Sequence, residues 1–231
     1  MLSDAMEDYL KAIFVLQETE EPPIPPSRIA DRVEVTTPTV TSMMATLEER
    51  GLVEREKYAG VQLTEEGERV ALEILRHHRL LEAYLAERLD YEWSEVHAEA
   101  EVLEHHISES FERRVAEALD HPRTDPHGDP IPGSDLTPVR DDTRPLSAFE
   151  SGDRLRVCRV RDEDPDVLSH LAAIGIEPGV EVVLRSVTPL SVYRIEVGGG
   201  RRHLPESIAD VLGVRPVEDG ESGAAYEPGE A

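Results

Sequence analysis

The spacing of apolar and polar positions predicts helices at the start of the chain. Residues 4–20 carry apolar side chains at helical intervals, and the pairs Pro22-Pro23 and Pro25-Pro26 end that pattern. Ser27 has the residue type that caps a helix N-terminus, so we expect a short second helix to begin there.

The next segment predicts a third helix and a hairpin. Thr36 and Pro38 are start signals, because threonine caps a helix and proline fits its first turn, and Gly51 has the residue type that ends one. Residues 52–55 and 61–64 alternate in polarity around a turn at residues 58–60 and predict a β-hairpin. This order of elements is that of a winged helix-turn-helix, which we place at residues 1–64.

Helical periodicity then continues for more than fifty residues. It predicts one helix over residues 66–89, a break at 90–93 and a second helix over 94–119. These apolar stripes exceed what a small DNA-binding module needs for its own core, so part of them is expected to form a dimer interface. We therefore predict a helical domain at residues 65–140, which ends in a proline-rich linker.

The pattern changes to period two near residue 151. Short alternating segments between glycines predict a small, mostly β domain, with a barrel as the expected form, at residues 145–216. The last fifteen residues, 217–231, hold five acidic and no basic side chains and predict a disordered tail. The predicted fold class is therefore mainly α with a small β domain.

Charge first appears to exclude a nucleic-acid partner. The chain has 49 acidic and 24 basic residues, a formal net charge of -25, and only two lysines. Surface acidity with arginine in place of lysine resembles proteins from salt-loving organisms, although an acidic protein from a GC-rich genome would look the same. Residues 35–47 carry no charge, however, so the predicted third helix is not repelled by phosphates.

Composition also limits the cellular setting. No run of about 18 apolar residues is long enough to span a bilayer, and charges interrupt the first twenty residues, so we expect a cytoplasmic protein without a membrane partner. The single cysteine, Cys158, excludes a disulfide scaffold and is expected to be a small buried core residue.

Histidines and glutamates recur at helical spacing in the helical domain. His78 and Glu82 are four residues apart, and His97, Glu101 and His105 repeat that interval, with a further carboxylate at residue 104. Oxygen and imidazole donors without a thiolate favour Mn²⁺ or Fe²⁺ over Cu(I) or structural zinc. The alternative is that these side chains form an ordinary solvated helix face.

Several motifs, in order along the chain, resemble the diphtheria toxin repressor family of metal-dependent repressors. The motifs are Met6-Glu7-Asp8-Tyr9-Leu10, Thr36-Thr37-Pro38-Thr39-Val40-Thr41, Glu56-Lys57-Tyr58-Ala59-Gly60, Leu63-Thr64-Glu65-Glu66-Gly67, His78-Arg79-Leu80-Leu81-Glu82, Glu104-His105-His106 and Gly128-Asp129-Pro130-Ile131-Pro132-Gly133. The resemblance covers about residues 1–216 and implies a DNA-binding domain, a metal-binding and dimerisation domain, and an SH3-like domain similar to small ferrous-transport accessory proteins.

The resemblance also implies two metal sites. The primary ligands would be Asp8, Glu101, Glu104 and His105, and the ancillary ligands would be His78, Glu82, His97 and Asp164. Iron-type members have methionine and cysteine at the positions of Asp8 and Glu101, so the primary site resembles the manganese type. Lys11 replaces a glutamate of manganese regulators, which leaves open whether the site holds one ion or two, and Val167 replaces a further ancillary ligand.

The DNA contacts implied by the family fall on the third helix and the hairpin. Thr36, Pro38 and Ser42 would face bases, and Thr39 and Thr41 would face phosphates; we add as candidates Thr37, Arg28, Arg50 and Tyr58. The alternatives are that Thr37 and Pro38 only start the helix and that the arginines, with Arg55 and Lys57, are ordinary surface bases.

We therefore expect a homodimeric repressor of metal-uptake genes that binds palindromic double-stranded operator DNA in response to Mn²⁺, with Fe²⁺ as the second choice. Two alternatives are a winged-helix regulator with a small organic effector and a carboxylate-histidine metallohydrolase. The chain contains neither an H-E-x-x-H motif nor a nucleophile elbow, so we do not expect an enzyme.

Overall fold

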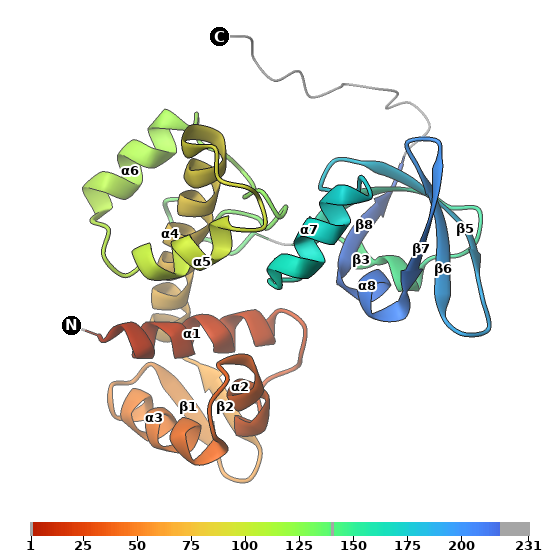
Figure 1. Ribbon diagram of the computed structural model, residues 1–231. Coiled ribbons are helices and arrows are strands. Elements are labelled where there is room, and N and C mark those ends of the chain that lie inside the picture. The colour runs from red at the N-terminus through yellow and green to blue at the C-terminus, as the bar shows by residue number, and fades with distance from the viewer. Residues whose placement is uncertain (1, 140, 218–231) are drawn as a thin grey trace. The chain divides into compact units, whose positions relative to one another are not determined.

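A computed structural model describes residues 2–139 and 141–217 (Figure 1). The chain divides into two compact units. The N-terminal unit contains residues 2–91, 96–125 and 130–139, and the C-terminal unit contains residues 92–95, 126–129 and 141–217. The predicted tail lies outside the described residues except for Val217.

The N-terminal unit begins with the predicted order of three helices and a hairpin. Its elements are α1 (Asp4–Gln17), α2 (Pro26–Arg32), α3 (Thr37–Glu49), β1 (Val53–Glu56) and β2 (Gly60–Leu63). Thr36 occupies the position before α3, as predicted, although its side chain makes no capping hydrogen bond to the backbone, and Gly51 follows the helix with a φ of +73°. Ser27 does not cap α2, because the helix already begins at Pro26, whose ring is preset for the first turn.

The core of this winged helix lies between α1, α2, α3 and the hairpin. Leu10, Ile13, Ile29, Val40 and Leu47 are fully buried there. The apolar face of α1 thereby joins the DNA-binding fold, and the opposite face of the same helix stays available for other contacts.

Helix α4 (Glu65–Leu89) links the two halves of the N-terminal unit. Thr64 caps it by accepting a hydrogen bond from Gly67 N at 3.1 Å. The first turns of α4 place Leu72 and Leu75 in the winged-helix core, and later turns place Leu80 and Leu81 in two smaller cores of the helical half. One continuous helix therefore belongs to both halves.

The helix predicted over residues 94–119 is wrong, because the structure has two helices there. They are α5 (Val96–Leu103) and α6 (Glu109–Ala118). Ser108 starts α6 by accepting a hydrogen bond from Phe111 N at 3.3 Å. The apolar faces of α5 and α6 pack in two separate cores against α4. One straight helix would not place both faces in these two cores. Glu104 and His105 consequently lie in the turn that follows α5.

The C-terminal unit is a small β domain, as predicted. Its antiparallel sheet has the strand order β3-β8-β4-β5-β6-β7 and is accompanied by the helices α7 and α8 and a short 3₁₀ turn. The bounds are β3 (Arg144–Pro145), η1 (Leu146–Ala148), β4 (Arg154–Val160), α7 (Pro165–Ala173), β5 (Glu181–Val187), β6 (Val192–Val197), β7 (Gly200–Pro205), α8 (Glu206–Val211) and β8 (Leu212–Pro216).

Cys158 is half-buried, so its predicted burial in the core is wrong. The pairing of β4 with β8 shifts register between Val157 and Arg159, and Cys158 occupies that irregularity. Gly128, from a segment before the sheet, lies against the same place. A side chain at Gly128 would come within 1.9 Å of the Cys158 carbonyl oxygen, and its φ is +85°, so only glycine fits.

Among the described residues, none of the helices is both long enough and apolar enough to cross a membrane.

Candidate metal centre and nucleic-acid interface

Three charged side chains share the face of α1 that points away from the winged-helix core. Glu7 and Asp8 lie four and three residues before Lys11, which places all three on one side of a helix. The buried residues Leu10 and Ile13 occupy the other side. Helix α1 therefore carries part of a polar cluster and part of the DNA-binding core at the same time.

The first candidate cluster joins α1 to the turn after α5. Donor atoms of Asp8, Glu104 and His105 lie within 4.8 Å of one another. His105 Nε2 is 2.9 Å from Asp8 Oδ1 and 3.5 Å from Glu104 Oε1. Asp8 Oδ1 is buried without a hydrogen-bond partner despite this proximity, because the directions are unsuitable. These donor atoms converge on a common point.

The other nitrogen of His105 is held by Glu7, a residue that the sequence analysis did not select. His105 Nδ1 lies 2.8 Å from Glu7 Oε2. A histidine that gives one nitrogen to a carboxylate presents the other in a fixed direction, so Nε2 is the nitrogen that faces Asp8 and Glu104. Glu7 and His105 are 98 positions apart, and no local spacing could have revealed their contact.

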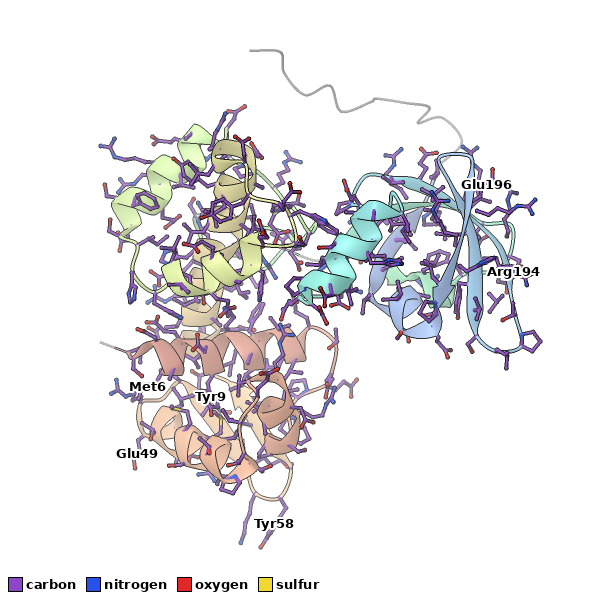
Figure 2. All side chains as sticks on the ribbon, in the orientation of Figure 1. Met6, Tyr9, Glu49, Tyr58, Arg194 and Glu196 are labelled. Carbon is purple, nitrogen blue, oxygen red and sulfur yellow. The ribbon has the colours of Figure 1, made fainter. Side chains whose placement is uncertain are left out.

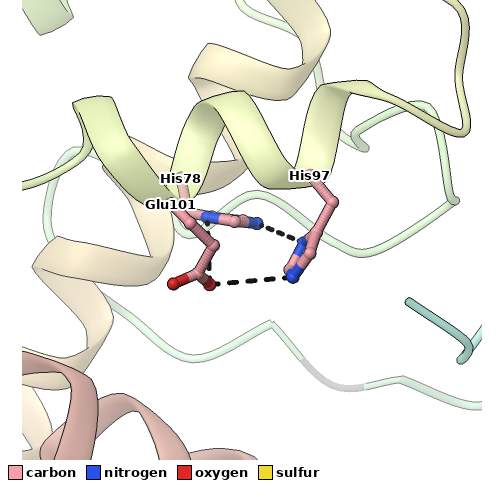
Figure 3. Close-up of side chains that lie close together, drawn as sticks. All are labelled: His78, His97 and Glu101. Atoms are coloured by element: carbon pink, nitrogen blue, oxygen red, sulfur yellow. Dashed lines mark hydrogen bonds and ion pairs between the residues drawn. The ribbon is translucent and has the colours of Figure 1, made fainter. Parts of the chain in front are cut away.

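The second candidate cluster contains His78, His97 and Glu101, whose donor atoms also lie within 4.8 Å of one another (Figure 3). His78 Nε2 lies 3.0 Å from His97 Nδ1, and His97 Nε2 lies 3.7 Å from Glu101 Oε1. Glu82 reaches both rings, with Oε1 at 2.9 Å from His78 and 3.1 Å from His97. Two imidazoles and two carboxylates from α4 and α5 therefore meet at one place.

Lys11 lies between the two clusters. Its Nζ donates to Glu101 Oε1 at 2.5 Å and to Glu104 Oε1 at 2.6 Å. The second oxygen of Glu104 lies 2.5 Å from His78 Nδ1. Glu104 is fully buried, so both of its oxygens are satisfied by cationic or polar partners.

The ionisation of these groups is tightly coupled. Burial disfavours the charged form of His78, but Glu82 and Glu104 outweigh burial and raise its pKa to about 10. Burial raises the pKa of Asp8, against the opposing effects of His105 and Lys11. For Lys11, burial lowers the pKa, but Glu104 and Glu101 reverse the direction and raise it. The raised pKa values of His78 and Lys11 favour their protonated forms, whose positive charge stabilises the buried carboxylates.

The predicted ligands are distributed differently from the implied primary and ancillary sets. Asp8, Glu104 and His105 come together, but Glu101 lies with His78 and His97 and reaches the first cluster through Lys11. Three of the implied ancillary ligands, His78, Glu82 and His97, come together. The ligand assignment itself stays a prediction.

Asp164 belongs to the C-terminal unit, and its side chain has a local task there. It caps α7 by accepting a hydrogen bond from Asp166 N at 2.9 Å. Val167 packs against the core of that unit. Neither residue shows a contact that requires a metal ion.

The donor set of the first cluster fits a divalent cation. It offers two carboxylates and an imidazole in a partly buried place, where Asp8 Oδ1 accepts no hydrogen bond and a divalent cation would offset its burial. The second cluster adds two imidazoles and two carboxylates of the same character. Both clusters therefore have the chemistry of sites for divalent metal ions.

The predicted reading surface is the exposed side of α3 and the residues before it. The side chains of residues 36–39, Thr41 and Ser42 are all exposed. Thr41 Oγ1 donates to Thr37 O at 3.0 Å, and Thr36 and Thr39 share a hydrogen bond of 2.8 Å between their hydroxyl groups. These contacts are local, so the methyl groups and the Pro38 ring remain open to a partner.

The basic and aromatic candidates differ in availability. Arg28 pairs with Glu20 at 2.6 Å, which offsets its charge. Tyr58 is 96% exposed at the tip of the wing, where Figure 2 shows it projecting away from the protein. Lys57 lies over its ring at 4.9 Å from the centroid. Arg50 is exposed immediately after α3.

Comparisons with known proteins agree along the chain. Residues 1–61 match the iron dependent repressor N-terminal DNA binding domain, residues 64–133 match the iron dependent repressor metal binding and dimerisation domain, and residues 144–216 match the FeoA domain. The chain is 32% identical over 229 residues to the iron-dependent repressor IdeR of Mycobacterium leprae, which covers 94% of this chain and 99% of that protein.

Two further relatives extend the picture. The diphtheria toxin repressor of Corynebacterium jeikeium is 36% identical over 215 residues, covering 93% of this chain and 83% of that protein. A solved structure titled as a manganese-dependent transcriptional repressor in complex with manganese aligns with a TM-score of 0.86 and 35% identity, over 92% of this chain and 100% of its own.

The winged helix, the carboxylate-histidine clusters beside it and the FeoA-type β domain define the class: a metal-dependent DNA-binding regulator. With relatives of more than 30% identity over nearly their whole lengths, the chain belongs to the diphtheria toxin repressor family of metal-dependent transcriptional repressors. It is a repressor and not an enzyme, because its full-length relatives are transcriptional repressors. The predicted SH3-like C-terminal domain is confirmed. The salt-loving habitat suggested by the acidity stays a prediction.

Proposed function

We propose that this repressor binds operator DNA as a homodimer when Mn²⁺, or in second place Fe²⁺, occupies the cluster of Asp8, Glu104 and His105. One observation carries the proposal: the donors of that cluster come from α1 in the DNA-binding half and from the turn after α5 in the helical half. Asp8 and His105 can hold one cation only if α1 and that turn keep their relative position.

The donor chemistry supports the choice of metal. Oxygen and nitrogen donors suit Mn²⁺ and Fe²⁺, and the site lacks the sulfur ligands that select Cu(I). A solved relative is in complex with manganese, and a full-length relative is named an iron-dependent repressor, which supports these two metals as candidates. His78, Glu82, His97 and Glu101 would hold an ancillary ion, and Asp164 stays a proposed member of that set despite its capping role.

The mechanism follows from electrostatics and geometry. Without a metal ion, α1 is joined to the helical half by the pairs that Lys11 makes with Glu101 and Glu104 and that His105 makes with Glu7 and Asp8. With the cation held by both, α1 is fixed to the helical half, and each recognition helix of the dimer takes up a defined spacing along a palindromic operator. Domains at 1–64, 65–140 and 145–216 are the proposed working parts.

DNA reading is proposed for the exposed start of α3. Thr36, Pro38 and Ser42 would contact base edges, where methyl groups and the proline ring suit thymine methyls. Thr37, Thr39, Thr41 and Tyr58 would lie toward phosphates, and Arg28 and Arg50 would support binding from the flanks. The regulated genes are proposed to encode metal uptake, as the family resemblance implies.

The test is operator binding, measured anaerobically with and without Mn²⁺, Fe²⁺ and Zn²⁺. Wild-type protein should bind the operator only with metal. Asp8→Asn should lose this metal-dependent binding while still folding as a dimer. Glu87→Gln, an exposed change on α4 outside both clusters, is the matched control. Equal DNA binding with metal and with a chelator would refute the proposal and favour an organic effector.

A further inference from the structure

Lys11 holds a position that a cation would otherwise fill. Its ammonium group lies 2.5 Å from Glu101 and 2.6 Å from Glu104, and each of these carboxylates belongs to a different candidate cluster. The side chain is only 13% exposed, so the ammonium is largely withdrawn from water. A cation at this depth stays because both carboxylates surround it.

Without Lys11, the carboxylates of Glu101 and Glu104 would be placed to be shared by two metal ions. Glu101 Oε1 lies 3.9 Å from His78 Nδ1 and 3.7 Å from His97 Nε2, and Glu104 Oε1 lies 3.5 Å from His105 Nε2. Carboxylate oxygens placed in this way can bridge two metal ions that lie a few ångströms apart. The ammonium already binds the Oε1 atoms of both carboxylates, so it occupies the bridging position.

We propose that Lys11 is a built-in cation that replaces a bridging metal ion. It keeps the two clusters as separate mononuclear sites, and it links α1 to α5 and its following turn before any metal binds. The inference rests on the proposed function for the identity of the metal sites, but its linking role concerns the metal-free protein. Metal binding at Asp8, Glu104 and His105 then completes a contact that Lys11 has already begun.

The geometry of α1 explains why this residue has such an effect. Lys11 is one turn after Glu7 and Asp8, and together they form the complete charged face of the helix at this level. Lys11 is the basic residue that α1 contributes to this place, and it contacts Glu101 and Glu104. Five acidic side chains lie in the two clusters and beside them: Glu7, Asp8, Glu82, Glu101 and Glu104. Loss of the Lys11 charge leaves Glu101 Oε1 and Glu104 Oε1 without the ammonium group that binds both.

The first experiment uses the metal-free full chain. Lys11→Met retains the length of the side chain and removes its charge, and Lys57→Met makes the same change at the exposed wing. Hydrogen exchange of the amides in α1 should become about tenfold faster in Lys11→Met, because a buried pair is broken and α1 opens more easily. Lys11→Arg should restore protection, and Lys57→Met should leave it unchanged. Unchanged exchange in Lys11→Met would overturn the linking role.

The second experiment reads the separation of the sites from electron paramagnetic resonance of bound Mn²⁺. Wild-type protein should show the resolved hyperfine lines of isolated ions at every occupancy. Lys11→Glu supplies a carboxylate where the ammonium was, and at full occupancy its ions should couple and lose those lines. A coupled spectrum from wild type, or a Lys11→Glu spectrum identical to wild type at the same stoichiometry, would overturn the inference.

The two measurements separate this inference from the proposed function. If wild type and Lys11→Glu both fail to bind Mn²⁺, Fe²⁺ and Zn²⁺, the metal-dependent function is wrong, and hydrogen exchange alone decides whether Lys11 links α1 to the turn. If metal binds and controls DNA binding but the spectra couple in wild type, the function stands and the role of Lys11 as a separator is wrong.

Discussion

Glu7 offers the sharpest quantitative prediction, because it acts on the candidate metal site through His105. Glu7→Gln keeps the size of the side chain and removes the negative charge beside Nδ1, which lies 2.8 Å from Glu7 Oε2. A hydrogen bond to a charged group contributes roughly 1.5–3 kcal/mol when buried. The Glu7 side chain is 20% exposed, which places the loss toward the lower end of that range.

A loss of about 1.5 kcal/mol corresponds to slightly more than about tenfold weaker Mn²⁺ binding, within the range of about 10- to 100-fold found for carboxylates that orient metal-binding histidines. Equilibrium titration of the metal-free protein with Mn²⁺ gives both affinity and stoichiometry. The affinity should fall while the number of bound ions stays constant, and Glu87→Gln, an exposed change on α4, should match wild type. Unchanged affinity would refute the orienting role, and loss of one bound ion per chain would make Glu7 a direct ligand instead.

Three other predictions follow from contacts elsewhere in the chain. Asp164→Ala should cost the C-terminal unit about 1 kcal/mol in thermal unfolding, because it removes the cap of α7, whereas Asp164→Ser should keep most of that stability. Both variants should bind the same number of metal ions as wild type. A lost ion in both variants would instead support a ligand role. Burial opposes ionisation of Asp141, but hydrogen bonds from Thr143, Arg159 and Arg161 hold the pKa of its carboxyl well below its usual range. The contribution of Asp141 to stability is therefore present above about pH 4 and is lost as the pH falls below that value. Acid unfolding of Asp141→Asn should accordingly show a weaker pH dependence below pH 4, and an identical pH profile would contradict the assignment. Lys57→Ala should reduce the salt slope of operator binding by about one unit if this wing lysine contacts a phosphate, and an unchanged slope would leave it an ordinary surface base.

Periodicity in the sequence was sufficient for the winged helix. Thr36, Pro38 and Gly51 mark the limits of α3 through local chemistry, and local chemistry is what a single sequence displays. The continuous helix predicted over residues 94–119 failed for the opposite reason. Helical spacing persists across His105, but packing of α5 and α6 in separate cores on α4 breaks the helix there. Tertiary contacts decided that boundary.

The candidate metal site shows the same limit. Residue types and spacing selected His78, Glu82 and His97, which do meet, because α4 and α5 preserve the helical intervals. Helix α5 ends at Leu103, and Glu101 and His105 lie in different clusters, so the helical spacing between them did not predict a shared site. Glu7 carried no local signal at all, since its partner is distant along the chain.

Helix α1 has a consequence for exchanging parts between members of the family. Its buried face completes the DNA-reading fold, and its charged face supplies Glu7, Asp8 and Lys11 to the cation clusters. A chimaera that receives its first 64 residues from a relative would therefore inherit operator preference and part of its metal selectivity together. An engineer who wants a new operator with the old metal response must graft α2, α3 and the wing and retain the charged face of α1.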